Sequence, residues 1–352
     1  MITVTNPPRF LIIQTAFIGD VILATALLEQ VHTVYPDAVL DMLVRQGNEG
    51  LLANHPFLND VLVWRKKGAG GAFAKYRDLG RLLRTIRARK YSVVLNLQRY
   101  GTMGSLTVLS GANSTIGFAQ NPFSRFFTRR VEYRFEPGVH EVDRNRRLLI
   151  ALTMVENHPG PKALARQATS RPNLYPSLND YAVVRPYQSG PYVCMSPMSV
   201  WFTKQYPAER WTELIQFMPD HLTIYLLGAP TDTATCDSIR QLSGQPERVV
   251  NLAGTLSLLQ SAALIQGAVM NYVNDSASLH LGSAMNAPTT AIFCSTVPEF
   301  GFGPLADQSR VVQTSEPLDC KPCTLHGRKA CPLGHYRCAW GIRVNEVAKL
   351  EL

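Results

Sequence analysis

Short runs of apolar residues alternate with longer segments of helical periodicity along the first part of the chain. The apolar runs predict buried strands at residues 10–13, 39–44, 61–64 and 92–97. Residues 20–28 have helical character, and residues 75–89 place their leucines and isoleucine on one face of a helix. Strands that alternate with helices indicate a parallel sheet with helices on both sides.

The same alternation returns after a proline-rich stretch. Residues 156–191 contain six prolines and show little periodicity, which is typical of a connection between domains. Beyond it, apolar runs predict strands at residues 192–196, 222–227, 249–252 and 289–293. We therefore expect two α/β domains at residues 1–170 and 191–352, with a linker at residues 171–190 and a ligand-binding cleft between the domains.

One stretch of the second half combines an apolar run with a polar turn. The run at residues 262–270 predicts a buried strand, the turn contains Asn274, Asp275 and Ser276, and small residues typical of a helix start follow. Ligands of α/β proteins bind at the carboxyl edge of the sheet, and the free N–H groups of a helix start suit a phosphate. Asp275 could equally serve only as a helix cap, and the stretch alone leaves both roles open.

Composition and charge narrow the class of protein. The chain has 352 residues, of which 46% are hydrophobic and 17% charged, so it can bury a full core. No apolar run approaches the roughly 18 residues of a membrane span, and we see no secretion signal. We therefore expect a cytoplasmic protein.

The net charge of +9 is concentrated in the first half, where arginines and lysines cluster at residues 65–67, 81–90, 125–134 and 144–147. Such a surface favours an anionic partner, which could be nucleic acid, an anionic lipid headgroup or a phosphorylated substrate, or it could simply be solvated. No nucleic-acid-binding motif accompanies the charge, so we do not expect nucleic acid as a partner.

The loop after the first strand contains Gly19 and Asp20 at the start of a helix. It lacks the glycine spacing of a dinucleotide-binding fingerprint. On the residues alone, a capping role is the simpler interpretation of Asp20. A carboxylate at this edge could also act as a general base.

Late in the chain, cysteines gather in a pattern that suits a metal. Seven cysteines are present, and Cys320, Cys323, Cys331 and Cys338 follow one another closely. An odd number without a secretion signal argues against a disulfide framework. Four thiolates suit a structural zinc, although the later spacings are not those of a standard zinc finger. Reduced thiols in a packed loop are the alternative, and His326 or His335 could replace one ligand.

Several motifs in a fixed order resemble glycosyltransferase family 9, the ADP-heptose:lipopolysaccharide heptosyltransferases and their relatives. The likeness extends from about residue 10 to residue 345. The motifs are Phe17–Thr25, His140–Asn145, Lys204 ahead of Trp211, Leu227–Pro230, Leu252–Gly254 and Asn274–His280. The resemblance implies a GT-B fold, in which two Rossmann-like domains face each other across a cleft. The first domain would bind the acceptor and the second the nucleotide-sugar.

The resemblance also implies roles for individual residues. Asp20, preceded by Gly19, matches the position of the catalytic base, and Lys204 that of a diphosphate-binding lysine. Ser276 and Ala277 would offer backbone amides to the diphosphate. The remaining positions match a phosphate contact, a ribose contact, a nucleobase contact, a donor-sugar contact and a histidine in the same motif, namely Ser199, Asp232, Leu256, Asp275 and His280.

This chain departs from the family pattern at three of these positions. Asp232 stands where most members have glutamate, Ala277 stands where glycine is usual, and Leu256 also differs from the common residue. His280 could equally be a packed histidine within its helix.

The resulting expectation is an inverting, metal-independent glycosyltransferase that needs no cofactor for catalysis. It would move heptose from ADP-heptose to a lipid-anchored saccharide of the lipopolysaccharide-core type, in peripheral contact with the inner face of the cytoplasmic membrane. One alternative is a GT-B transferase that uses another nucleotide sugar in surface polysaccharide assembly. Another is a non-catalytic relative that binds a nucleotide-sugar or lipopolysaccharide.

Overall fold

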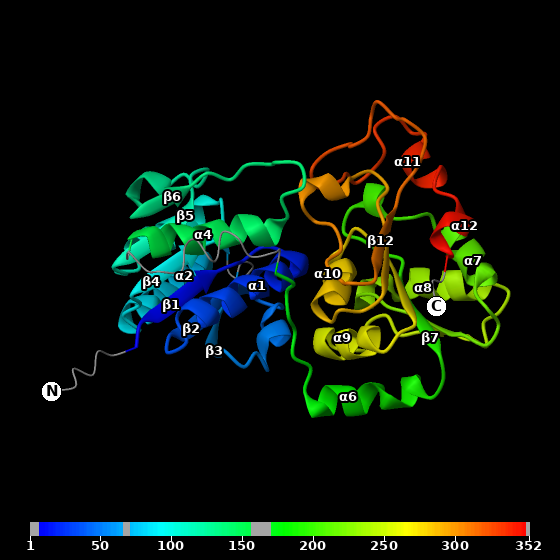
Figure 1. The fold of residues 1–352 in the computed structure, drawn as a ribbon, viewed down its shortest axis with the longest axis horizontal. Coiled ribbons are helices and arrows are strands. Elements are labelled where there is room, and N and C mark those ends of the chain that lie inside the picture. Colours follow the sequence, from blue (N-terminus) through cyan, green and yellow to red (C-terminus); the bar gives the residue numbers. More distant parts are fainter. Residues whose placement is uncertain (1–6, 66–70, 156–169, 350–352) are drawn as a thin grey trace. The chain divides into compact units, whose positions relative to one another are not determined.

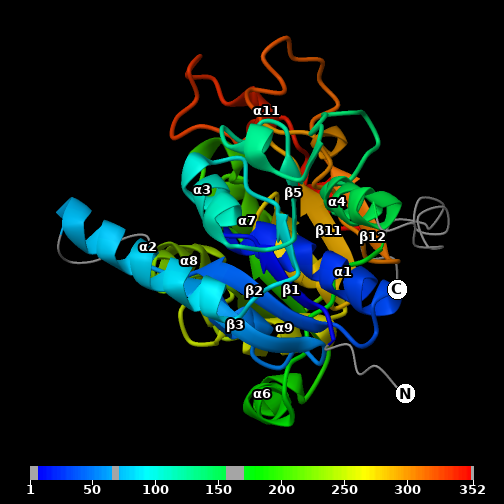
Figure 2. The same ribbon diagram turned by 90° about the vertical axis from the view of Figure 1, so that its left-hand side faces the viewer.

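The computed structural model describes residues 7–65, 71–155 and 170–349. Two compact units make up the fold, shown in two views in Figures 1 and 2. The first unit consists of residues 1–135 and 141–172, and the second of residues 136–140 and 173–352. Each unit has one parallel sheet flanked by helices, so the prediction of two α/β halves is confirmed.

In the first unit, the described residues form a six-stranded sheet with the order β3-β2-β1-β4-β5-β6. Its strands are β1 (Arg9–Ile13), β2 (Val39–Arg45), β3 (Leu58–Trp64), β4 (Val93–Asn96), β5 (Ser114–Phe118) and β6 (Arg129–Val131). Its helical segments are α1 (Ile18–Val34), η1 (Glu49–Leu52), α2 (Gly71–Ala88), α3 (Gly101–Leu109), η2 (Ser124–Phe126) and α4 (Glu141–Val155). Figure 2 shows α2 beside β3, and α4 packs against α1.

In the second unit, the described residues form a six-stranded sheet with the order β12-β11-β10-β7-β8-β9. Its strands are β7 (Tyr192–Ser196), β8 (Thr223–Leu226), β9 (Val249–Asn251), β10 (Met270–Asn274), β11 (Thr289–Ile292) and β12 (Ser309–Val312). Its α-helices are α6 (Leu178–Val184), α7 (Ala208–Phe217), α8 (Thr233–Leu242), α9 (Leu258–Gln266), α10 (Ala277–Ala284), α11 (Arg337–Trp340) and α12 (Val344–Val347). Short 3-10 turns are η3 (Arg185–Gln188), η4 (Phe202–Lys204), η5 (Pro230–Asp232) and η6 (Pro298–Phe300).

Both sheets reverse their strand order at one point, which is typical of the Rossmann arrangement. In the first sheet the reversal lies between β1 and β4, and in the second between β7 and β10. All residues of β7 and β10 are buried, as expected for central strands covered on both faces. The loops that follow these strands are the places where an α/β sheet binds ligands.

The apolar run at residues 262–270 is mainly helix rather than the predicted strand. Residues up to Gln266 belong to α9, and β10 begins only at Met270. The Ser257 hydroxyl accepts a hydrogen bond from the Gln260 backbone amide at 3.2 Å, and the Gln260 side-chain oxygen accepts one from the Ser257 backbone amide at 2.9 Å. This capping box starts a helix, a signal that hydrophobicity alone does not provide.

The structure also contains elements that the sequence analysis did not predict. The span predicted as a linker, residues 171–190, contains α6 and η3, and the Tyr181 hydroxyl of α6 donates to the Gln266 side chain at 2.6 Å. The strands β5, β6 and β12 were not predicted. β6 has two exposed arginines, so it lacks the apolar signature of a buried strand.

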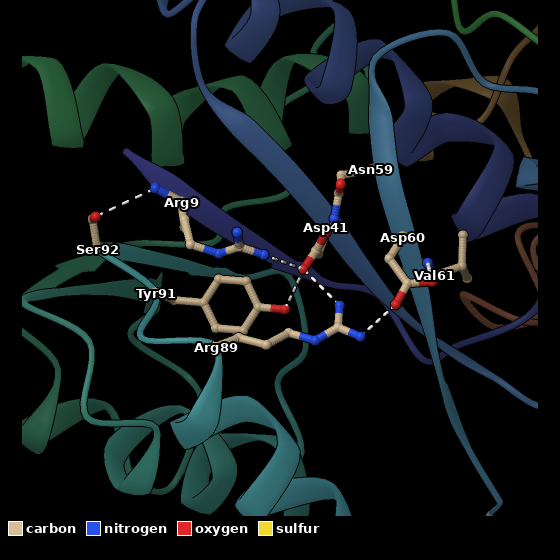
Figure 3. Close-up of polar contacts among 8 residues, drawn as sticks. All are labelled: Arg9, Asp41, Asn59, Asp60, Val61, Arg89, Tyr91 and Ser92. Atoms are coloured by element: carbon tan, nitrogen blue, oxygen red, sulfur yellow. Dashed lines mark hydrogen bonds and ion pairs between the residues drawn. The ribbon is translucent and has the colours of Figure 1, made fainter. Parts of the chain in front are cut away.

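A fully buried carboxylate, Asp41 on β2, ties neighbouring strands of the first sheet together (Figure 3). It accepts hydrogen bonds from the Tyr91 hydroxyl at 2.6 Å, from Arg89 at 2.7 Å and from Asn59 at 2.8 Å. Arg9 of β1 lies 3.5 Å away as a second cation. Arg89 also bonds Asp60 of β3, and this bond lowers the pKa of the Asp60 carboxyl. These contacts satisfy the buried charge with partners from or beside β1, β3 and β4.

The substitution Asp41→Ala should lower the free energy of unfolding by about 3–5 kcal/mol, because it leaves buried cationic and polar groups without their acceptor. Chemical denaturation would measure the change. The matched control is Asp78→Ala, which removes a carboxylate paired at 3.2 Å with the largely exposed Arg81. This control should cost at most about 1 kcal/mol. Equal losses in the free energy of unfolding for the two variants would contradict a stabilising role of Asp41 between the strands.

Candidate active site

Asp20 lies in the first turn of α1, directly after the loop that leaves β1. Its Oδ2 accepts a hydrogen bond from the Phe17 backbone amide at 3.2 Å. The carboxylate therefore caps the helix, as the residues alone suggested. A cap of this kind also fixes the side chain at the carboxyl edge of the sheet, where a ligand can reach it.

The surroundings of Asp20 favour its neutral form. Burial, and to a smaller extent the nearby Glu141, raise the pKa of the Asp20 carboxyl, which lies at about 6. Hydrogen bonds from the Phe17 and Asp20 backbone and the Arg99 charge oppose this shift. A carboxyl with a pKa close to neutrality is suited to accept a proton in a reaction at physiological pH.

Glu141, the first residue of α4, is the centre of a buried polar cluster. It accepts a hydrogen bond from the Tyr133 hydroxyl at 2.6 Å and one from Arg144 at 3.0 Å. Burial raises the pKa of the Glu141 carboxyl, while these hydrogen bonds and the Arg144 and Arg99 charges lower it. The Arg99 guanidinium lies 4.2 Å from the centre of the Tyr133 ring.

These neighbours of Asp20 were not predicted as site residues. Glu141 and Arg144 belong to the motif at residues 140–145, which was the only sequence signal for them. Tyr133 and Arg99 come from loops after β6 and β4 and join the cluster only through the fold.

A row of arginines and exposed aromatic rings follows the same edge of the first sheet. Phe17, Tyr100, Phe126 and Phe135 are between 44% and 68% exposed, and they follow β1, β4, β5 and β6 respectively. Guanidinium groups lie over three of these rings, with Arg45 5.4 Å from Phe17, Arg125 4.6 Å from Phe126 and Arg144 4.9 Å from Phe135. We call these residues, together with Arg99 and Tyr133, the arginine–aromatic edge.

In the second unit, Lys204 and Asp275 form an ion pair. The Lys204 Nζ lies 2.7 Å from Asp275 Oδ2, and both side chains are largely buried. Asp275 also accepts a hydrogen bond from the Thr296 hydroxyl at 2.6 Å. Lys204 is the last residue of η4, and Asp275 directly follows β10. The fold therefore brings two residues predicted from separate motifs into direct contact.

The start of α10 lies beside this ion pair. Ser276 precedes the helix with an extended backbone, and its side chain makes no capping bond. Among the described residues, Ser276 Oγ is a buried atom without a hydrogen-bond partner. The amides of the first turn and an unsatisfied hydroxyl together make a suitable anion site.

His280 follows one turn later and is 5% exposed. Burial lowers the pKa of its imidazole to about 3, with smaller contributions from His140 and Lys204, so the ring is neutral at physiological pH. Its Nδ1 is a second buried atom without a partner in the described part of the chain. A neutral imidazole can donate or accept one hydrogen bond to a ligand.

The other predicted residues of the second unit lie in the loops that leave β7, β8 and β9. The Ser199 carbonyl accepts a bond from the Gln205 side chain at 2.7 Å. Asp232 Oδ2 accepts a hydrogen bond from the Ala229 backbone amide at 2.8 Å and so caps η5. Leu256 is half-buried just before α9. These residues share the carboxyl edge with Lys204 and Asp275 without forming part of the ion pair.

The four late cysteines line one pocket. Cys320, Cys323, Cys331 and Cys338 surround it together with His335, and Cys320 Sγ lies 3.9 Å from His335 Nε2. All seven cysteines are free thiols. Within the described ranges, however, no three histidine, cysteine or acidic side chains are placed to hold a metal ion. The structure thus gathers the predicted ligands without forming a coordination shell.

None of the described helices combines the length and apolar character that a membrane span requires.

Comparison with known proteins identifies similar sequences. The family model described as "Glycosyltransferase family 9 (heptosyltransferase)" matches residues 79–336. Lipopolysaccharide heptosyltransferase 3 of Escherichia coli (strain K12) is 24% identical over 285 residues, covering 79% of this chain and 80% of the relative. Lipopolysaccharide heptosyltransferase 1 of Pseudomonas aeruginosa is 25% identical over 339 residues, covering 92% of this chain and 87% of the relative.

Solved structures are similar in fold. A glycosyl transferase family 9 protein from Veillonella parvula DSM 2008 has a TM-score of 0.80 at 19% identity, covering 98% of this chain and 96% of that chain. E. coli ADP-heptose lps heptosyltransferase II has a TM-score of 0.75 at 19% identity, covering 90% and 95%. The iron-containing dodecameric glycosyltransferase TibC of enterotoxigenic E. coli has a TM-score of 0.54 at 16% identity, covering 97% and 75%.

The substitution Glu141→Gln should lower the pKa of Asp20, because it removes a neighbouring negative charge that favours the protonated form. Carboxyl-carbon NMR titration of the folded protein would measure this pKa. Asp143→Asn is the matched control, since it removes a charge from the same turn of α4 that is paired with Arg146 at 2.7 Å. An Asp20 pKa that stays in place in the Glu141 variant, or moves equally in both, would show that Glu141 has no such influence.

Proposed function

Because the chain belongs to glycosyltransferase family 9, and is thus a glycosyltransferase of GT-B fold, we propose that it transfers heptose from ADP-heptose to a saccharide of the lipopolysaccharide core. The observation that carries this proposal is the meeting of Lys204, Asp275 and the start of α10 at one point of the second sheet. The names of its relatives, which are lipopolysaccharide heptosyltransferases, support the choice of donor and acceptor.

The donor diphosphate would bind between Lys204 and the first amides of α10. A lysine ammonium neutralises phosphate charge, and the backbone amides of Ser276 and Ala277 add donors whose position is fixed by the helix. Lys204 is paired with Asp275 at 2.7 Å. As the diphosphate takes over the ammonium, the Asp275 carboxylate becomes able to accept hydrogen bonds from the hydroxyls of the donor sugar.

Transfer would proceed as a single displacement with inversion at the anomeric carbon. Asp20 accepts the proton of the acceptor hydroxyl while that oxygen bonds to the anomeric carbon and the bond to the diphosphate oxygen breaks. With a pKa of about 6, the Asp20 carboxyl is mostly ionised at neutral pH and remains a useful base. Lys204 and the α10 amides stabilise the negative charge on the leaving diphosphate, a task that otherwise needs a metal ion.

The acceptor would bind along the arginine–aromatic edge. Aromatic rings stack on the apolar faces of sugars, and guanidinium groups form bidentate hydrogen bonds to phosphates and carboxylates. The combination therefore suits a saccharide with anionic groups better than a neutral one. An acceptor that is anchored in a lipid would bring the protein to the inner face of the cytoplasmic membrane, where the basic first half can interact with anionic headgroups.

Two alternatives compete with this proposal. Asp232, Leu256 and Ala277 differ from the usual family residues in the proposed donor site, which is compatible with another nucleotide sugar in surface polysaccharide assembly. A non-catalytic binding protein is the other alternative. The raised pKa of Asp20 speaks against it, because strongly shifted groups gather at catalytic sites.

Calorimetry of the purified protein with ADP, UDP, GDP and dTDP should show selective binding of ADP that is unchanged by EDTA. Asp20→Asn should retain this affinity and lower turnover by about 10²–10⁴-fold, the usual contribution of a general base. Asp37→Asn, which changes an exposed carboxylate just beyond α1, is the matched control and should transfer sugar at the normal rate.

Each result separates the alternatives. If the protein prefers another nucleoside diphosphate, the proposed reaction would stand but its donor would be a different nucleotide sugar. Unchanged turnover in Asp20→Asn would remove the proposed base. Absence of binding by every nucleotide would support the non-catalytic alternative.

We also propose a structural zinc held by Cys320, Cys323, Cys331 and Cys338. The proposal is supported by the donor set, because thiolates are preferred zinc ligands and the four lie around one pocket. Four protein ligands leave no open position, so such a metal would stabilise the fold and take no part in transfer. A likeness in fold to an iron-containing relative makes iron the other metal to test.

Elemental analysis of the purified protein should find about one zinc ion per chain. Cys323→Ser should lose the metal, whereas Cys236→Ala, which changes a buried cysteine of α8 outside the pocket, should keep it. Iron in place of zinc would change the identity of the metal. A metal-free protein with four reactive thiols would contradict the site.

A further inference from the structure

The Cys-rich tail, defined as residues 320–338, packs directly on the turn that contains Lys204. The Thr203 amide donates to the Arg328 carbonyl at 3.1 Å, and the Arg328 amide donates to Thr203 Oγ1 at 2.8 Å. Ser295 also donates to Thr203 Oγ1 at 3.0 Å, and the Cys323 amide donates to the Ser295 carbonyl at 2.8 Å. A reciprocal pair of bonds thus joins the tail to the residue before Lys204.

A second contact fixes the other part of the same turn. The rings of Phe202 and Tyr336 stack with their centres 5.0 Å apart. The Tyr336 hydroxyl donates to the Phe202 carbonyl at 2.9 Å and also to the Gln205 carbonyl. The residues on both sides of Lys204 are therefore tied to the tail.

The tail also touches the Lys204 side chain itself, at Gly327. This glycine is buried and has a φ of +84°, a conformation that favours glycine. A Cβ at this position would lie 2.9 Å from Lys204 Cγ and 3.0 Å from Trp201 Cβ. The Gly327 backbone is thus the surface on which the lysine stem lies.

We infer that the Cys-rich tail positions Lys204 for the donor diphosphate, and that Gly327 is the positioning residue that sets the path of the lysine stem. The inference rests on the proposed function, which gives Lys204 its role. A lysine has a long flexible side chain, so its charge is useful at a fixed place only if neighbouring groups restrict it. The Gly327 backbone restricts the lysine stem, and Asp275 lies 2.7 Å from the ammonium and fixes its end.

The tail offers a matched pair of glycines for the test. Gly327 and Gly334 both have positive φ angles, of +84° and +71°, so alanine strains the backbone at either position. Gly334 has no atom within 4 Å of the added Cβ, whereas Gly327 has the lysine stem. Calorimetry with ADP should show binding about tenfold weaker in Gly327→Ala than in Gly334→Ala, equivalent to about 1.4 kcal/mol. Thermal unfolding would verify that both variants are folded at the temperature of the calorimetry, although Gly327→Ala should melt lower because its Cβ also meets Trp201.

A double-mutant cycle separates positioning from general damage to the tail. In a Lys204→Ala background, Gly327→Ala should have no further effect on ADP affinity, because the residue acts only through the lysine. Equal ADP affinity in the two glycine variants would overturn the inference. The inference would also be overturned if, in the double variant, the losses of ADP affinity caused by Gly327→Ala and Lys204→Ala added in full.

Two further variants apply if Gly327→Ala does not fold. Thr203→Val removes the hydroxyl that holds Arg328 and should weaken ADP binding, and Thr203→Ser should restore it. Equal affinity of these two variants would overturn the inference as well. Failure of the proposed function gives a different result, since wild type would then not bind ADP or Lys204→Ala would bind it normally.

Discussion

Parallel pairing of the strands is the constraint on which both candidate sites depend. In a parallel sheet every strand ends at the same edge, so the loops that follow neighbouring strands meet there. Lys204 follows β7 and Asp275 follows β10, which are far apart in sequence but adjacent in the second sheet. The same rule brings Arg99, after β4, near Asp20, after β1. Each pair lies at the point where the strand order of its sheet reverses.

The two sites use buried charge in opposite ways. Lys204 and Asp275 compensate each other, so neither is left as an isolated buried ion. Asp20 and Glu141 are like charges, and their proximity together with burial makes the ionised form of Asp20 less favourable. Tyr133 and Arg144 hold Glu141 in place through hydrogen bonds. The first unit therefore contains a carboxyl whose pKa is raised, and the second contains a pair of charges that neutralise each other.

Residues whose position depends on local chain geometry could be located from the sequence. Asp20 lies in the first turn of the helix after an apolar strand, and Asp275 lies between an apolar strand and a helix, so their position at a sheet edge was accessible from pattern alone. The helix α9 was misassigned because a short buried helix and a buried strand are equally apolar. The capping pair of Ser257 and Gln260 was the signal that could have corrected it.

Residues whose role depends on packing between distant segments could not be predicted in this way. Tyr133 and Arg99 contact each other only after β4 and β6 have entered the sheet. Gly327 has no sequence feature that distinguishes it from Gly334, and its contacts with Lys204 and Trp201 in the fold make the difference. The cysteines gave the ligand type of a metal site, yet their spacing did not reveal that their pocket shares Thr203 with the lysine turn.

In the proposed reaction, the ion pair between Lys204 and Asp275 would also affect how the cycle ends. Cleavage of the donor releases a nucleoside diphosphate with one more negative charge than it had in the sugar-linked form. A lone cation would hold this product most tightly at the moment when it has to leave. Asp275 lies 2.7 Å from the same ammonium and would compete with the product for it. In the proposed reaction this competition would shorten the residence of the product and so favour turnover where release limits the rate.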